Sequence, residues 1–182
     1  MRRVAIALSV AAACAACAVR APEPPAPRVA NPRYEPTSPE VVKAMLDLAG
    51  TTSADVVYDL GCGDGRIVIM AATRYRARGV CVDIDPERIA EARANALAAG
   101  TADRIRFLNE DLLTTDLADA TVVTLYLSNE LNLALRPKLE RELRPGSRVV
   151  SHWHALGGWK PQRAIGVPSE FGERFLYLWT IR

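Results

Sequence analysis

Residues 56–65 read Val56-Val57-Tyr58-Asp59-Leu60-Gly61-Cys62-Gly63-Asp64-Gly65. A short, mostly apolar run followed at once by glycines is typical of a strand buried on both faces of a parallel sheet. The three glycines at alternate positions remove side chains, so that the backbone can approach a ligand closely. A helix predicted from Arg66 to Tyr75 places unpaired N–H groups behind this loop. The segment therefore predicts a strand, a glycine-rich loop and a helix that together form a ligand site.

Strands and helices alternate along the chain from residue 34 onward. Proline follows a capping residue at Ser38-Pro39 and Asp85-Pro86, which indicates two helix starts, and Gly50 and Gly100 mark the ends of those helices. We predict helices over 38–49, 66–75 and 85–99 and one ending near 144, with strands over 56–60, 79–83, 104–109, 121–127, 147–153, 163–167 and 174–181. This alternation is typical of α/β proteins. The predicted fold is a single domain with a doubly wound, mostly parallel seven-stranded sheet.

Three acidic residues end or follow three successive predicted strands. Asp59 ends the first, Asp83 ends the second and Asp111 follows the third. Ligands of open parallel sheets bind beyond the carboxyl ends of the strands, where a carboxylate such as Asp83 can accept hydrogen bonds from ribose hydroxyls. The spacing G-x-G-x-G departs from the G-x-G-x-x-G of dinucleotide binders, and no lysine is placed to hold a triphosphate. The pattern predicts a nucleotide-type site of another kind, with Asp111 near an adenine edge.

These motifs resemble those of the class I S-adenosylmethionine-dependent methyltransferases. The resemblance spans residues 34 to 153 and rests on segments 57–65, 82–85 and 110–112. It implies a Rossmann-like methyltransferase fold with S-adenosyl-L-methionine as cofactor. Gly61 and Gly63 would lie beneath the methionine part, with Asp59 near its ammonium, directly or through water. Asp83 would bind the ribose and Asp111 would lie near the adenine amine.

A narrower resemblance lies outside these motifs. Segments 34–37, 63–68, 123–127, 137–139 and 148–152 are similar to a small group that includes mitochondrial lysine N-methyltransferases acting on membrane proteins such as the ATP synthase c subunit, together with short bacterial relatives. This resemblance implies N-methylation of a protein lysine or a similar amine. It also implies that Tyr34 and Thr37 close over the cofactor.

The segment after the fourth predicted strand lies beside the transferred methyl group in this fold. Methyl transfer needs an aligned nucleophile, and an amine must lose its proton before it attacks. Tyr126, Asn129 and Glu130 are the candidate catalytic residues, because each could orient or deprotonate an amine. Equally, the stretch could merely start a helix that Pro137 breaks. The Asn/Asp-Pro-Pro-Tyr signature of enzymes that methylate amino groups of nucleic acids and glutamine is missing here, which disfavours those substrates.

The first 33 residues have a different composition. Met1-Arg2-Arg3 precedes an apolar run over 4–16, as in secretory signals, and Ala15-Ala16-Cys17 resembles a lipoprotein box. Seven of the twelve prolines lie within 21–39, which is typical of a semi-rigid spacer. We predict a leader over 1–18, a spacer over 19–33 and the methyltransferase domain over 34–182, in a protein exported to or lipid-anchored in the cell envelope. The alternative is a misassigned start codon and a cytoplasmic protein.

The net charge of +2 belongs to the N-terminal part of the chain. Residues 1–36 hold five basic and two acidic residues, and subtraction from 23 and 21 leaves 18 and 19 for the rest. A near-neutral domain lacks the electrostatic footprint of a nucleic-acid binder, so we expect no nucleic-acid partner. His152 and His154 are expected to share one face of the fifth strand, but no cysteine or acidic motif joins them, so we expect no metal. We expect a monomer whose methyl acceptor is a protein or a small molecule, with membrane contact through the leader. Two alternatives remain open: a methyltransferase of a small molecule or membrane lipid, and a non-catalytic S-adenosylmethionine-binding envelope protein.

Overall fold

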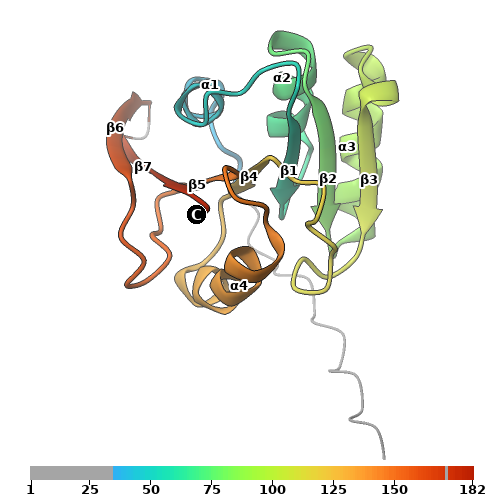
Figure 1. Ribbon diagram of the computed structural model, residues 1–182. Coiled ribbons are helices and arrows are strands. Elements are labelled where there is room, and N and C mark those ends of the chain that lie inside the picture. Colours follow the sequence, from blue (N-terminus) through green and yellow to red (C-terminus); the bar gives the residue numbers. More distant parts are fainter. Residues whose placement is uncertain (1–34, 171) are drawn as a thin grey trace, which may run out of the picture.

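One seven-stranded sheet organises the chain, in the order β3-β2-β1-β4-β5-β7-β6 (Figure 1). The computed structural model describes residues 35–170 and 172–182. Strands β1 to β5 pair in parallel, whereas β7 runs antiparallel to both β5 and β6. The strands are β1 Val56–Leu60, β2 Arg78–Asp83, β3 Ile105–Asn109, β4 Val122–Leu125, β5 Arg148–His152, β6 Arg163–Ser169 and β7 Gly172–Thr180. The predicted fold class is confirmed.

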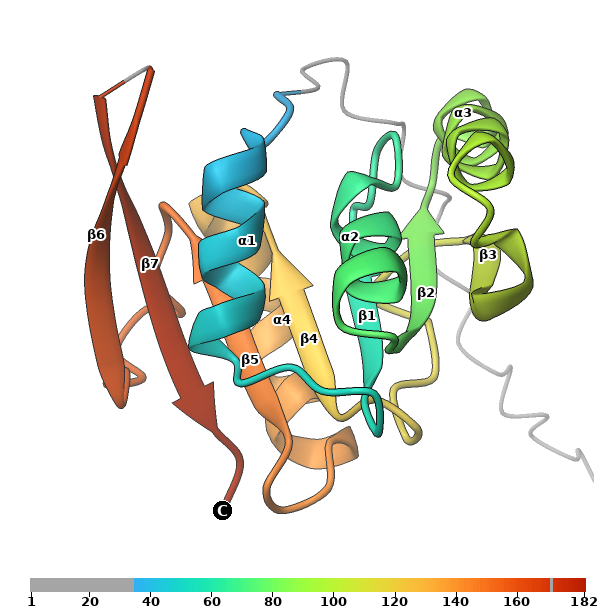
Figure 2. The same cartoon turned by 90° about the horizontal axis from the view of Figure 1, so that it is seen from above.

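Helices cover both faces of this sheet (Figures 1 and 2). They are α1 Pro39–Leu48, α2 Arg66–Arg74, α3 Pro86–Ala98 and α4 Asn129–Glu142, with a short 3-10 helix at Ala102–Arg104. Helices α1, α2 and α3 lie side by side on one face, and α4 lies on the other (Figure 2). Alternate residues of β1 pack against the helices on opposite faces of the sheet, because successive side chains of a strand point to opposite faces. Tyr58 and Leu60 pack in one cluster with Leu135 and Leu139 of α4, while Val57 packs in the other with α1.

Two details of the predicted elements are wrong. Strand β4 ends at Leu125, so Tyr126 and Leu127 leave the sheet instead of extending it. Pro137 lies inside α4 and does not break it, because the helix continues to Glu142. The proline has no N–H to donate to the carbonyl of Leu133, so α4 loses this one hydrogen bond and continues beyond it.

The predicted leader, the spacer and Tyr34 lie outside the described residues. Within residues 35–170 and 172–182, no helix has the length and apolar character that a bilayer crossing requires.

Candidate active site

A cavity of about 1120 Å³ opens at the carboxyl ends of β1, β2 and β4. The strand order reverses between β1 and β4, and the arrowheads of β2 and β4 point toward the same edge in Figure 2. Cofactor candidates Asp59, Gly61, Asp83 and Asp111 line one part of it. The other part is lined by residues from the segment before α1, the β4–α4 connection and the ends of β5 and β7. The cavity therefore has two halves, which we call the cofactor half and the acceptor half.

A buried carboxylate forms the floor of the cofactor half. Asp59 is only 2% exposed and accepts a hydrogen bond of 2.8 Å from the hydroxyl of Thr124. Burial raises the pKa of Asp59 to about 7, and the negative charges of Asp83 and Asp64 act in the same direction, while the Thr124 hydrogen bond opposes them. A buried acid that opens into a cavity is well suited to a ligand carrying a positive charge, which would restore the ionised form.

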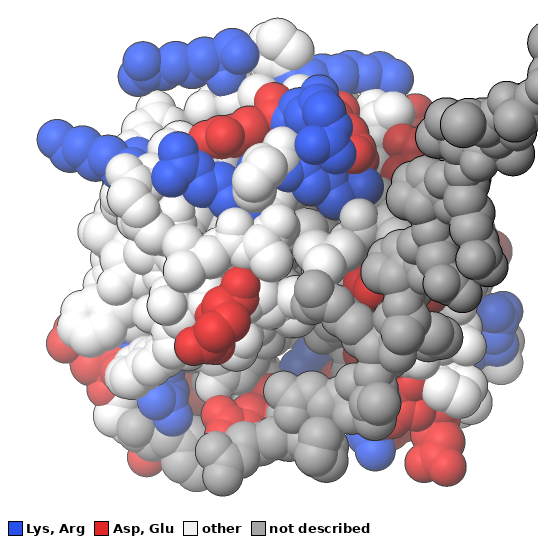
Figure 3. All heavy atoms as spheres, turned by 90° about the horizontal axis from the view of Figure 1, so that it is seen from below, with Lys and Arg blue, Asp and Glu red and all other residues white. Residues whose placement is uncertain are grey.

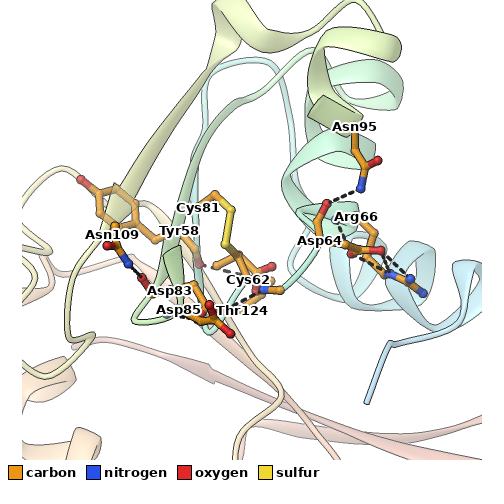
Figure 4. Close-up of a disulfide and its surroundings, with 12 residues drawn as sticks. Tyr58, Cys62, Asp64, Arg66, Cys81, Asp83, Asp85, Asn95, Asn109 and Thr124 are labelled. Atoms are coloured by element: carbon orange, nitrogen blue, oxygen red, sulfur yellow. Dashed lines mark hydrogen bonds and ion pairs between the residues drawn. A yellow bond between two sulfur atoms is a disulfide. The ribbon is translucent and has the colours of Figure 1, made fainter. Parts of the chain in front are cut away.

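Asp83 joins the glycine loop to the end of β2 (Figure 4). Its two carboxylate oxygens accept hydrogen bonds of 3.0 Å from the backbone N–H groups of Gly63 and Asp85. Asp85 itself caps α3 by accepting from the N–H of Glu87, as its sequence predicts. Asp111 lines the cavity and also caps the turn that follows it, accepting from the N–H of Leu113 at 2.9 Å.

The loop backbone requires glycine at two positions. Gly61 has a φ of +84°, and a Cβ placed there would come within 2.8 Å of the side chain of Leu127. Gly65, at the N-cap of α2, has a φ of +80°, and its Cβ would come within 2.9 Å of Ala92 on α3. Both conformations disfavour residues with a side chain. Gly61 thus keeps the floor of the cavity open, and Gly65 allows α2 and α3 to approach each other closely.

A disulfide between Cys62 and Cys81 also holds this loop (Figure 4). Cys62 lies between two loop glycines, Cys81 lies within β2, and both are buried. The residues are 19 apart in the chain, and the pairing arises because β1 and β2 are neighbours in the sheet. The sequence allowed these cysteines to pair but gave no spacing signal that they would.

The acceptor half is built around Tyr126, which directly follows β4. Its hydroxyl donates a hydrogen bond of 3.0 Å to the carboxylate of Glu35, and its ring stacks on His152 with centroids 4.0 Å apart. The Nδ1 atom of His152 lies 3.3 Å from the hydroxyl of Thr37, and the carbonyl of Thr37 accepts from Arg66. Burial raises the pKa of Tyr126, and the adjacent Glu35 raises it further. Burial lowers the pKa of His152 to about 4, with help from the positive charge of Arg174, so the imidazole is neutral near pH 7.

The other two catalytic candidates occupy the start of α4. Glu130 lines the cavity, whereas Asn129 is not among the lining residues of the described chain. The pKa of Glu130 is lowered by hydrogen bonds from the backbone N–H of Glu130 and from the hydroxyl of Ser128. Ser128 also caps α4 by accepting from the N–H of Leu131 at 3.3 Å. Glu130 is therefore a weak proton acceptor compared with a group of ordinary pKa.

The structure adds residues that the sequence did not single out. Glu35 belongs to a recognised segment, but nothing in the spacing connects it to Tyr126. Trp153 and Arg174 line the acceptor half as well. His152 and His154 were expected to share one face of a strand, but β5 ends at His152 and the chain turns at Trp153. Among the described residues, no three His, Cys, Asp or Glu side chains come together in a way that suits a metal ion.

The residues of the cofactor half fit S-adenosylmethionine. Its α-ammonium would be received by the buried Asp59, its ribose by Asp83 and its adenine amine by Asp111. The space that a Cβ at Gly61 would fill remains open for the methionine part. These assignments follow from the chemistry of the residues that line the cavity.

Comparison with known proteins agrees with this fit. A family model described as the ANTKMT methyltransferase domain matches residues 59–163, more than half of the chain. A protein-lysine N-methyltransferase of Saccharolobus islandicus (strain REY15A) is 44% identical over 149 residues, which cover 81% of this chain and 92% of that protein. An adenine nucleotide translocase lysine N-methyltransferase of Mus musculus is 32% identical over 133 residues, which cover 73% of this chain and 58% of that protein.

A solved structure extends the similarity to three dimensions. The crystal structure of an RNA methyltransferase from Salinibacter ruber in complex with S-adenosyl-L-homocysteine matches with a TM-score of 0.77 at 48% identity, covering 81% of this chain and 94% of that one. The resemblance drawn from the motifs is confirmed, and so is the cofactor. The chain belongs to the ANTKMT methyltransferase family and is an S-adenosylmethionine-dependent methyltransferase.

Proposed function

We propose that this enzyme N-methylates lysine side chains of a protein acceptor. The observation that carries the proposal is the acceptor half of the cavity, where the hydroxyl of Tyr126 and the carboxylate of Glu35 are hydrogen-bonded next to the glycine loop. Oxygen atoms of this kind suit an amine that must be bound as a cation and aligned as a nucleophile. The 44% identical relative that is a protein-lysine N-methyltransferase supports the same acceptor class.

The residues of the chain divide the work between binding and alignment. When bound, S-adenosylmethionine supplies a methyl group that its sulfonium already activates. Asp59, Asp83 and Asp111 hold the cofactor at the floor of the site. The hydroxyl of Tyr126 donates a hydrogen bond to Glu35, and its oxygen lone pairs accept from an amine N–H, which aligns the amine. Before it attacks, the amine loses its proton to solvent water beside the exposed Glu130.

The direct test is methyl transfer from radiolabelled S-adenosylmethionine into a cell extract fractionated into protein, RNA and lipid. We expect the label in protein, and methyl-lysine after digestion and mass spectrometry. At limiting cofactor, Asp83→Ala should reduce the incorporation at least tenfold, because the ribose would lose its acceptor. Label that appears in RNA or lipid, with none in protein, would contradict the proposal.

RNA is the second candidate acceptor, because the Salinibacter ruber protein is described as an RNA methyltransferase. Charge argues against it. On the α4 side, Lys138 and Arg141 both pair with Glu142, Arg136 pairs with Glu140, and blue and red side chains are interleaved along one border (Figure 3). Phosphate backbones need an excess of unneutralised positive charge, which these pairs do not provide. A small-molecule or lipid acceptor, or a cofactor-binding protein without activity, would show in the same fractions as label in lipid or as no label.

We also propose that the protein works in the cell envelope, with residues 1–18 as a signal or lipoprotein leader. The Cys62–Cys81 disulfide supports an oxidising location, since such bonds are rare in the cytosol. Fractionation of cells that carry a C-terminally tagged copy, with alkylation of free thiols at lysis, tests both points. A cytoplasmic pool with both cysteines alkylated would support the misassigned start instead.

A further inference from the structure

The chain turns abruptly at Trp153, at the mouth of the acceptor half. Trp153 has a φ of +70°, one of two positive values at non-glycine positions in the described chain, and the N–H of His154 donates to the carbonyl of His152 at 2.9 Å. A hydrogen bond between residues two apart, around a positive φ, defines the rarer and strained form of the γ-turn. Glycine would suit this position better, so the large indole has a reason to be there.

Hydrogen bonds on both sides fix the turn. The N–H of Trp153 donates to the carbonyl of Phe175 on β7 at 2.7 Å. The carbonyl of His154 accepts from the hydroxyl of Ser151 at 2.6 Å and from the amide of Asn132 on α4 at 3.1 Å. Three elements therefore hold the strained residue in place, which is how a strained conformation persists at functional sites.

The turn presents the indole to the cavity and to solvent together. Trp153 is 41% exposed and lines the acceptor half. The ring of Phe175 lies 6.1 Å from it, and the guanidinium of Arg174 lies 5.1 Å from the ring centroid. Trp153 and Phe175 are two of the large apolar side chains that stay exposed in the described chain. An aromatic surface at the mouth of a cavity is a typical place for a ligand to pack.

We propose that Trp153 and the Glu35–Tyr126 pair form the two ends of a lysine subsite. This proposal rests on the lysine methyltransferase function proposed above. The methylenes of the lysine pack on the indole, and the ammonium reaches the carboxylate of Glu35 and the hydroxyl of Tyr126. The cationic Arg174 stands beside the indole and the anionic Glu35 beside Tyr126, so charge favours one direction of insertion, with the ammonium inward.

His152 is the positioning residue of this subsite. Its ring stacks on Tyr126, and it directly precedes the turn that presents Trp153. Because the imidazole is neutral near pH 7, it adds no positive charge that would repel the lysine. One buried side chain therefore fixes both ends of the subsite relative to each other.

The three tryptophans of the chain allow a direct test that does not depend on activity. The full-length protein is labelled with ¹⁵N and saturated with S-adenosylhomocysteine, and the indole N–H signals are followed while N-acetyl-lysine methylamide is added. The signal that Trp153→Phe removes identifies Trp153. We expect this signal to move with affinity in the millimolar range, while that of the buried Trp179 stays in place.

Matched ligands and variants separate the two ends of the subsite. N-acetyl-norleucine methylamide, which lacks the ammonium, should bind more weakly, and Glu35→Gln should weaken the lysine response about tenfold. Glu40→Gln, on the exposed surface of α1, should leave it unchanged. An unmoved Trp153 signal, equal responses to the two ligands or an unaffected Glu35→Gln variant would each overturn the proposal.

Two further measurements keep the result independent of folding and of the proposed function. Trp153→Gly suits the φ of the turn, so this variant should fold and bind S-adenosylhomocysteine normally, while saturation-transfer signals of the lysine ligand disappear. Retained lysine binding by this variant would refute the role of the indole. Calorimetry with S-adenosylhomocysteine tests the cofactor half by itself. Absence of cofactor binding would contradict the methyltransferase function, whereas normal cofactor binding with an unmoved Trp153 signal would contradict only the subsite.

Discussion

Asp59 makes cofactor binding depend on pH in a defined direction. Its pKa of about 7 in the free protein means that the carboxyl is largely protonated at pH 6. The α-ammonium of the cofactor favours the ionised form, so binding must release the proton. The affinity should therefore fall as the pH falls below 7 and stay level above it.

The magnitude follows from the pKa. If only ionised Asp59 binds, the dissociation constant of S-adenosylhomocysteine rises about tenfold at pH 6 and about ninetyfold at pH 5, relative to pH 8. Each unit of pKa is worth about 1.4 kcal/mol. Stability should change in the opposite direction. Between pH 3.8 and 7 the folded, cofactor-free protein holds a proton that the unfolded chain has lost, so the free energy of unfolding falls as the pH rises, by about 4 kcal/mol at most.

Isothermal titration calorimetry with S-adenosylhomocysteine from pH 5 to 8 measures the first effect. Repeating the titration at pH 6 in buffers of different ionisation enthalpy counts the protons, and we expect about 0.9 released per cofactor. Asp59→Asn should bind weakly at every pH, without this slope, while its free energy of unfolding at pH 8 exceeds that of the wild type. A pH-independent dissociation constant in the wild type, or binding without proton release, would refute the role given to Asp59.

Three further perturbations address the loop around it. Replacing both Cys62 and Cys81 by serine should lower the free energy of unfolding by about 3 kcal/mol, as expected for a closed loop of this length. Urea denaturation of the wild type with and without reductant measures the effect of the disulfide, and equal midpoints under the two conditions would count against the bond. Gly61→Ala should lower the melting temperature and remove the stabilisation by S-adenosylhomocysteine, because the added Cβ would clash with Leu127. Gly100→Ala is the matched control, since its φ is +67° but the space around it is open; it should lower the free energy of unfolding by only about 1–2 kcal/mol and keep that stabilisation. Asp83→Ala should weaken S-adenosylhomocysteine binding at least tenfold, about 1.4 kcal/mol. An unchanged dissociation constant by calorimetry would contradict the assignment of the ribose to Asp83.

The cofactor half could be predicted from the sequence because its residues are close together in the chain. The strand, the loop and the helix of residues 56–75 form one continuous segment, and its glycines indicate the positive φ values that the loop adopts. Asp83 is only 20 residues from Gly63, to which it bonds. The helix starts were predictable for the same reason, since capping residues and prolines act locally.

Tyr126, Glu130 and Thr37 of the acceptor half were predicted and line the cavity, but their partners were not, because these contacts join distant parts of the chain. Glu35 and Tyr126 are 91 residues apart, and Thr37 and His152 are 115 apart. These pairs meet only because β4 and β5 are neighbours and the segment before α1 passes over their ends. The turn at Trp153 gave no signal, since a bulky residue stands where the pattern would favour glycine.

The two halves are therefore held in different ways. The glycine loop is fixed by the Cys62–Cys81 bond, by Asp83, and by the carbonyl of Val82, which accepts from the N–H groups of Gly61 and Cys62. Such a loop reaches its binding geometry before the cofactor arrives, so little ordering opposes binding.

In the acceptor half, Tyr126 stacks on His152 and donates a hydrogen bond to the exposed Glu35, and Thr37 of the same segment contacts His152 and Arg66. The hydrogen bond between Tyr126 and Glu35 is exposed and therefore weak, so the Glu35 side chain can shift to admit an acceptor at little cost, while the buried Thr37 holds the segment in place. We therefore expect the side of the cavity formed by Glu35, Tyr126 and Trp153 to select the acceptor. Substitutions at Glu35 and Trp153 should consequently change which amine is methylated and leave cofactor affinity intact, because none of the three contacts that fix the loop passes through either residue.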